Sequence, residues 1–207
     1  MNIFSRIKAF IKQEPEEQIA GYSIPELKSV FVKSLLTRDG FLPSYPRVTP
    51  LEGVGIPAYY TSFIIDQKET LNFVARIESK FNYVTEKTFN DLIVKKYSNT
   101  QKNEHLIFFT STREFNSVTV RLVTNSADFL AAIADEKFSV PPPWVAFESY
   151  NPSWWGGHMQ GAQGYYNDNY FLPFFTQLSD SEKQSYYAKF EAPTEWIKAL
   201  ELIHDDE

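Results

Sequence analysis

The sequence of 207 residues contains no cysteine, which excludes a disulfide framework, a thiolate zinc site and a thiol nucleophile. Its three histidines do not have the H-x-x-x-H or H-E-x-x-H spacing of zinc hydrolases. There is no G-x-S-x-G motif, and the glycines do not form a dinucleotide fingerprint or a P-loop. We therefore expect no metal and no cofactor, and the sequence favours a protein that is not an enzyme.

Long apolar runs are also missing, since no stretch has transmembrane length and residues 1–12 lack the apolar centre of a secretory signal. These absences favour a cytoplasmic protein. Residues 1–12 do have an amphipathic pattern, with cations away from an apolar stripe formed by Ile3, Phe4, Ile7, Phe10 and Ile11. A helix of this kind can lie on an anionic membrane, but we expect it to pack on its own protein.

The charge balance is acidic, with 20 Lys and Arg against 26 Asp and Glu and a net charge of −6. A negative protein is a poor non-specific nucleic-acid binder, because phosphate recognition needs a positive field. The acidity fits solubility, and it also fits a basic protein partner.

Aromatic residues are concentrated near the C-terminus, where 15 of the chain's 34 lie between Trp144 and Trp196. Such a density indicates either an aromatic core or an aromatic binding surface. The core is the favoured interpretation, because most large aromatics are buried. Residues exposed from this stretch would form the binding site, and the candidates are Trp144, Glu148, Trp154, Trp155, His158, Gln160 and Tyr165.

Two other functions are compatible with the same stretch. His158 lies beside a double glycine, and with Glu148 or Asp168 it would form an acid–base pair in an enzyme pocket. The simpler interpretation is a histidine that hydrogen-bonds its own loop. Paired tryptophans with nearby amides are also suited to stacking on a sugar, and those residues are Trp154, Trp155, Gln160, Asn167 and Asn169.

Prolines and glycines mark the boundaries within the stretch. Residues 141–143 are three consecutive prolines, which predict an extended, rigid connector. Gly161 and Gly164 stand where a helix should begin, and we expect close packing of the backbone against an aromatic ring there rather than an anion site. Pro173 predicts a kink or a break in that helix.

Elsewhere the pattern alternates between helices and strands. Capping boxes predict helix starts at Ser23 and Ser179. The expected helices are 1–12, 23–38, 85–97, 126–135, 179–190 and 193–203. The expected strands are 58–65 and a hairpin of 105–112 with 117–124, while 41–57 reads as a long loop. Residues 69–80 fit both periodicities, and we take them as a helix.

These elements predict one α+β domain over 1–207, in which a small, largely antiparallel sheet has flanking helices. Its parts are a helical lead (1–22), a central α/β part (23–140) and an aromatic helical part (141–207). The leading hypothesis for function is a non-enzymatic module that binds a basic protein partner, such as a bacterial immunity-type antidote. The alternatives are the small enzyme or sugar binder described above, and a membrane-surface protein anchored by residues 1–12.

Overall fold

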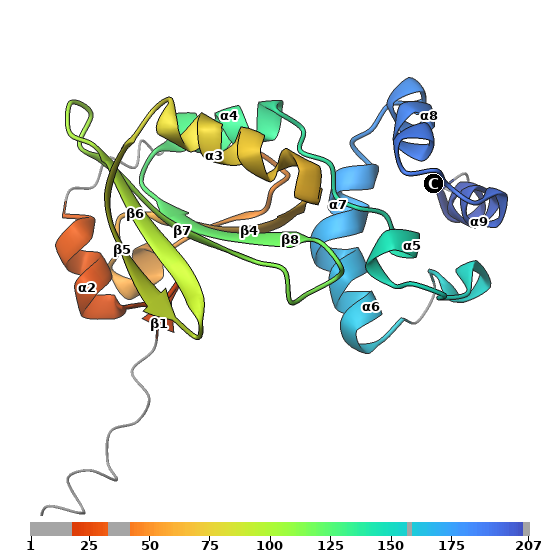
Figure 1. The fold of residues 1–207 in the computed structure, drawn as a ribbon, viewed down its shortest axis with the longest axis horizontal. Coiled ribbons are helices and arrows are strands. Elements are labelled where there is room, and N and C mark those ends of the chain that lie inside the picture. Colours follow the sequence, from red (N-terminus) through yellow and green to blue (C-terminus); the bar gives the residue numbers. More distant parts are fainter. Residues whose placement is uncertain (1–17, 33–41, 157–158, 205–207) are drawn as a thin grey trace, which may run out of the picture.

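A computed structural model describes residues 18–32, 42–156 and 159–204 of the chain. It confirms the α+β class: a six-stranded sheet, antiparallel throughout, lies beside a group of C-terminal helices (Figure 1). The strands, in their order across the sheet, are β3 (Val48–Pro50), β4 (Tyr59–Ile65), β8 (Val118–Thr124), β7 (Glu104–Ser111), β6 (Leu92–Asn99) and β5 (Asn82–Phe89).

The sheet is covered on both faces. Helices α3 (Thr70–Glu78) and α4 (Ala127–Asp135) lie on one face. The other face carries α2 (Ile24–Val30) and a small hairpin of β1 (Gln18–Ile19) with β2 (Tyr22–Ser23). Because both faces are covered, β4, β7 and β8 are mostly apolar along their length, as the sequence shows.

Several predicted elements are confirmed within two residues of their predicted ends. These are the strand at 58–65, the hairpin strands at 105–112 and 117–124, and the helices at 69–80 and 126–135. The helix in 69–80 buries Phe73 and Ile77 against the sheet. These two residues are spaced at the helical one of the two periodicities. The predicted loop at 41–57 contains β3 and a single 3-10 turn at Glu52–Val54.

The predicted helix at 85–97 is wrong, because these residues form the β5–β6 hairpin. Its turn is Asn90-Asp91, and both residues have positive φ, of 48° and 59°. Two such residues at the centre of a tight turn match the twist of the flanking strands, and Asn and Asp tolerate that conformation. The apolar residues on which the helix prediction rests, Phe89, Leu92 and Ile93, do not face one core: Ile93 is 48% exposed on the opposite face from Leu92.

The N-terminal part also differs from its prediction. The capping box at Ser23 is present, but α2 ends at Val30, before the predicted end near residue 38. Phe31 leaves the helical conformation and is buried against the sheet, so the chain turns inward there. A helical lead was predicted over residues 1–22, and the part of it that the structure describes lies in the β1–β2 hairpin. The helix expected at 1–12 lies outside the described residues.

The three prolines lie inside the protein. Pro142 is extended, as predicted, but Pro143 opens a short helix, α5 (Pro143–Ala146), where its fixed φ and missing N–H suit the first turn. All three prolines are buried. The Tyr186 hydroxyl donates to the Val140 carbonyl at 2.6 Å, and the Tyr166 hydroxyl donates to the Pro141 carbonyl. Buried tyrosines therefore satisfy the carbonyls of this segment.

The helix around Pro173 changes its winding, as the sequence predicts for a break. Helix α6 (Gly161–Tyr166) passes into a π-helical segment (Asn167–Phe171), and α7 (Leu172–Phe175) then begins with Pro173 in its first turn. The Leu172 N–H donates five residues back, to the Asn167 carbonyl. The wider turn accommodates a residue that has no N–H to donate.

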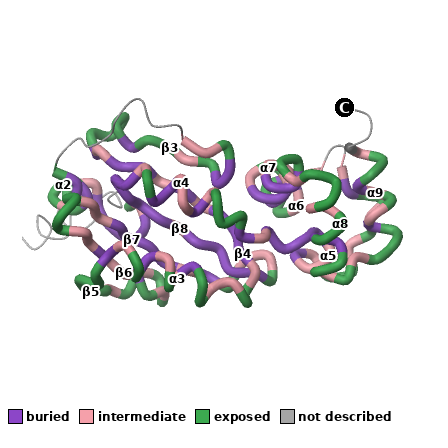
Figure 2. The backbone as a smooth tube through the Cα atoms, turned by 90° about the horizontal axis from the view of Figure 1, so that it is seen from above, coloured by how far each residue is buried: buried purple, intermediate pink, exposed green. Residues whose placement is uncertain are grey.

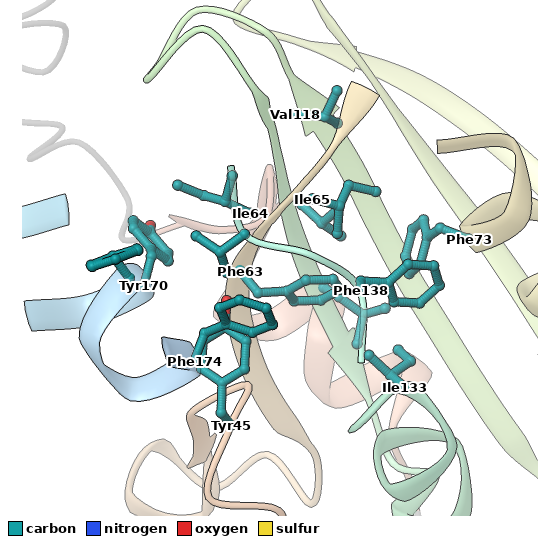
Figure 3. Packing of buried hydrophobic residues seen from close by; sticks show 14 of the residues in the cluster. Tyr45, Phe63, Ile64, Ile65, Phe73, Val118, Ile133, Phe138, Tyr170 and Phe174 are labelled. Atoms are coloured by element: carbon teal, nitrogen blue, oxygen red, sulfur yellow. The ribbon is translucent and has the colours of Figure 1, made fainter. Parts of the chain in front are cut away.

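The C-terminal helices share their core with the sheet. Helices α8 (Asp180–Lys189) and α9 (Thr194–His204) complete this part. One apolar cluster runs from the face of the sheet under α3 and α4 into these helices. Figure 3 shows Tyr170 and Phe174 lying against Phe63 and Ile64 of β4. Figure 2 shows buried positions continuing from the sheet into the helices, so most of the aromatic stretch is core, as favoured.

The start of α8 predicts a pH dependence. The Glu182 carboxylate accepts from Lys137 Nζ at 2.5 Å and from the Ser179 N–H at 2.8 Å. These bonds lower the pKa of Glu182 from 4.5 to about 2, and the bond from Lys137 makes the largest contribution. A carboxyl whose pKa is lower in the folded protein stabilises the fold above its unfolded pKa, and this stabilisation is lost as pH falls through the folded pKa.

Glu182→Gln is therefore expected to melt lower than the parent at neutral pH, with the difference disappearing between pH 4.5 and about pH 2. Melting curves across that range measure it. The control is Glu201→Gln, because Glu201 is exposed and forms no ion pair with any described residue. A difference that persists unchanged at pH 2 would contradict the assignment.

Candidate binding surfaces

Two of the seven predicted binding residues are part of the core. Trp155 is 6% exposed and its ring meets five others, those of Phe147, Tyr150, Tyr166, Phe171 and Trp196. Trp144 is half-buried against Trp196, and its indole N–H donates to the Phe190 carbonyl at 3.0 Å. The prediction of a paired-tryptophan surface is corrected accordingly: the two neighbours separate, with Trp155 inside and Trp154 outside.

Four of the predicted residues are exposed: Trp154, Tyr165, Glu148 and Gln160. His158 lies outside the described residues, so the acid–base hypothesis stays a prediction. Trp154 is the last residue of a 3-10 turn (Pro152–Trp154) that Asn151 caps, and its side chain is 67% exposed. Its ring meets Tyr150 edge-on at 6.1 Å, and Tyr150 meets the buried Trp155 at 5.9 Å. A chain of three rings therefore supports an exposed indole.

Tyr165 faces a different neighbourhood. It is 54% exposed and meets Tyr170 edge-on at 5.8 Å, and the Tyr170 hydroxyl lies 3.2 Å from Ser62 Oγ on β4. Among the described residues no ring contact joins Tyr165 to Trp154. We call the exposed indole with its supporting ring, Trp154 and Tyr150, the Trp154 surface.

A groove on the sheet was not predicted. It has a volume of about 490 Å³ and lies on the face that carries α2, at the edge of the β1–β2 hairpin. We call it the Arg121 groove. Its polar lining residues are Gln18, Tyr60, Asn90, Ser111, Arg113, Glu114 and Arg121, and its apolar ones are Ile19, Ala20, Leu51, Phe89, Leu92 and Phe109.

Arg121 stands near the centre of the sheet, where Ser62 and Phe109 lie directly opposite it on the two neighbouring strands. Its side chain is 27% exposed. One guanidinium nitrogen donates to both carboxylate oxygens of Glu114, at 2.9 and 3.0 Å. Glu114 belongs to the β7–β8 turn, and the next residue, Phe115, packs against Tyr166 and Phe147. The turn thus contributes Glu114 to the groove, and through Phe115 it also packs against the C-terminal part of the protein.

The ion pair favours the charged form of Arg121. Burial lowers the pKa of Arg121, but the hydrogen bond and the charge of Glu114 outweigh burial and raise its pKa above the ordinary value. Tyr60 lies beside the guanidinium, and burial raises the pKa of this tyrosine although Arg121 opposes the shift. The sequence contained a signal for this site, since Arg121 interrupts the apolar strand 118–124. A charge at the centre of a covered strand needs a partner.

No family model, curated protein or solved structure matches the chain. Its function must therefore be argued from its own surfaces. In the part of the chain that the structure describes, no helix has the length and apolar character needed to cross a bilayer. Within the same residues, no three His, Asp or Glu side chains gather as metal ligands would.

Proposed function

We propose that the protein is a non-enzymatic binding module that holds a protein partner on the Trp154 surface. The observation that carries the proposal is the 67% exposure of an indole whose neighbouring ring is anchored in the core. Tryptophan is enriched among the residues that dominate protein–protein affinity. A ring held in place before binding loses little conformational entropy on association, which favours this role.

The charge distribution supports a basic partner. Residues 141–207 carry ten Asp and Glu against three Lys and Arg, a net charge of −7, whereas residues 1–140 carry sixteen against seventeen, a net charge of +1. The acidity of the protein therefore belongs to the part that bears Trp154. Among the described residues of this part, six carboxylates form no ion pair: Glu148, Asp168, Asp180, Glu191, Glu195 and Glu201.

An acidic field around an aromatic contact favours fast association with a basic protein. A bacterial immunity-type antidote to a basic toxin enzyme is the concrete form of this function. Such a protein needs no catalytic group of its own, and its task is to occupy the partner's surface. The proposal thus assigns affinity to Trp154 and steering to the carboxylates of residues 141–207.

The test uses the full chain as bait and then measures the kinetics of its isolated partner. Trp154→Ala is expected to raise the off-rate and cost about 2 kcal/mol or more in affinity, with an unchanged melting curve. The matched control is Leu71→Ala, because Leu71 is also exposed, at 81%, but lies on α3. Glu148→Lys is expected to slow association more than Glu52→Lys, which makes the same charge change outside the acidic part.

Association that does not change with salt, together with an off-rate that Trp154→Ala leaves unaltered, would exclude this surface as the binding site. A captured partner whose affinity responds equally to Leu71→Ala and Trp154→Ala would also contradict it. Melting curves of each variant separate a loss of binding from a loss of folding.

A further inference from the structure

The Arg121 groove differs in charge from the rest of the protein. Among the residues that the structure describes, its charged lining residues are Arg113, Arg121 and Glu114, so this lining carries a net charge of +1 in a chain of net charge −6. Glu114 is committed to Arg121 through both its oxygens. Arg113 is 55% exposed, and its ion pair is a long one of 4.0 Å to Asp91, which is itself 94% exposed. Arg113 is thus only weakly neutralised.

We propose that the Arg121 groove binds a small organic monocarboxylate with an apolar or aromatic body. This site is separate from the Trp154 surface, and the proposal does not depend on the proposed function. The carboxylate lies against Arg113 at the polar end of the groove, beside the Arg121–Glu114 pair. The apolar body lies on the side chains of Phe89, Leu92 and Phe109.

The charge count selects a monoanion. One negative charge neutralises a lining of net charge +1, whereas a dianion such as phosphate would leave the groove negative in an acidic protein. A guanidinium forms strong charge-assisted hydrogen bonds with a carboxylate, and inside the groove itself one nitrogen of Arg121 donates to both oxygens of Glu114.

The size and lining select a small molecule. A volume of about 490 Å³ lies within the range of small-molecule sites, which are mostly apolar with a few convergent polar groups. Phe89, Leu92 and Phe109 lie on β5, β6 and β7, so ordered strands position them. Phe109 also carries the Arg121 guanidinium over its ring, at 5.7 Å from the ring centre. The charged and the aromatic parts of the site therefore adjoin.

The experiment titrates the full chain with three probes of one shape, followed by NMR of the backbone amides. The probes are phenylacetate, the neutral phenylacetamide and the cationic phenethylamine. We expect phenylacetate to bind at least about tenfold more tightly than either of the others, because only it carries a carboxylate. The shifted amides are expected in the β7–β8 turn and at Phe89, Leu92 and Phe109.

Two variants are expected to change the affinity in opposite directions. Arg113→Gln removes the weakly neutralised cation and is expected to weaken phenylacetate binding about tenfold. Glu114→Gln removes the only carboxylate among the described lining residues and is expected to strengthen it, because Arg121 becomes available. The control is Arg47→Gln, since Arg47 is exposed and does not line the groove. It is expected to leave the affinity unchanged.

Equal binding of all three probes, or an equal loss from Arg47→Gln and Arg113→Gln, would show that the groove does not recognise a carboxylate. Weaker binding by a folded Glu114→Gln protein would contradict the charge argument. An acetylated peptide acid that ends in phenylalanine is the last probe. If it binds and phenylacetate does not, the occupant is a peptide and the small-molecule proposal fails.

Discussion

Trp155→Ala is expected to destabilise the protein by about 3–5 kcal/mol, the usual cost of truncating a buried large aromatic. Trp155 is 6% exposed, and its ring is met on several sides by Tyr150 and by rings of α6, the π-helical segment and α9. The cavity left by alanine cannot close easily, because the neighbouring rings are held by one another. This loss is a large part of the stability of a domain of ordinary size.

Denaturant unfolding of the full chain measures this cost, and the adjacent residue provides the control. Trp154→Ala removes the same side chain from a 67% exposed position and is expected to change the free energy of unfolding by less than about 1 kcal/mol. Because both variants replace a tryptophan by alanine, the difference between their free energies of unfolding reports the effect of burial. Equal destabilisation by both would show that Trp154 is not a surface residue.

Gly164→Val is expected to cost about 3 kcal/mol or more, at the upper end of the range for overpacked sites. A Cβ atom at position 164 would stand 2.8 Å from the Met159 carbonyl oxygen, which belongs to the backbone and cannot rotate away. Alanine would already meet this oxygen, and valine adds two methyl groups. Gly164 is therefore a close approach in a buried part of α6, as predicted, but its neighbour is backbone and not an aromatic ring. The same prediction for Gly161 is wrong, because nothing lies within 4 Å of its Cβ position.

Two other glycines are the controls for Gly164. Gly161 has open space around its Cβ position but a φ of +64°, so Gly161→Val is expected to cost less, through backbone strain of about 1–3 kcal/mol. Gly53 has open space and no positive φ, so Gly53→Ala is expected to be neutral or slightly stabilising. Melting curves rank the three variants. If Gly164→Val melts above Gly161→Val, the contact with Met159 does not restrict this position.

Local signals in the sequence predicted the starts of α2 and α8 well. A capping box brings four neighbouring residues together, so the boxes at Ser23 and Ser179 depend little on the rest of the fold. The break at Pro173 is equally local, since the residue itself lacks the N–H. Central strands such as β4 were predictable because burial on both faces produces a continuous apolar run.

The β5–β6 hairpin was missed because an edge strand has few apolar residues to show a period of two. Most of β5 is exposed, and the turn residues Asn90 and Asp91 were the remaining signal. The site was harder to predict than the fold. Whether Trp154 or Trp155 points outward depends on the position of α9 and α6, which no local pattern fixes. The ion pair of Arg121 with Glu114 joins a strand to the turn that precedes it. The groove around this pair could not be predicted from the sequence, because it depends on how the strands pair.

The buried prolines have a consequence for experiments on the protein. Residues 141–143 connect the α4 side of the sheet to the C-terminal helices, and none of the three has an amide proton. Hydrogen exchange and amide-detected NMR therefore give no signal from the centre of this connection. The Tyr166 and Tyr186 hydroxyls that bind the carbonyls of Pro141 and Val140 are the reporters that remain. Tyrosine-selective ring labelling would thus report on the connection between the sheet and the C-terminal helices at positions where backbone amide probes give no signal.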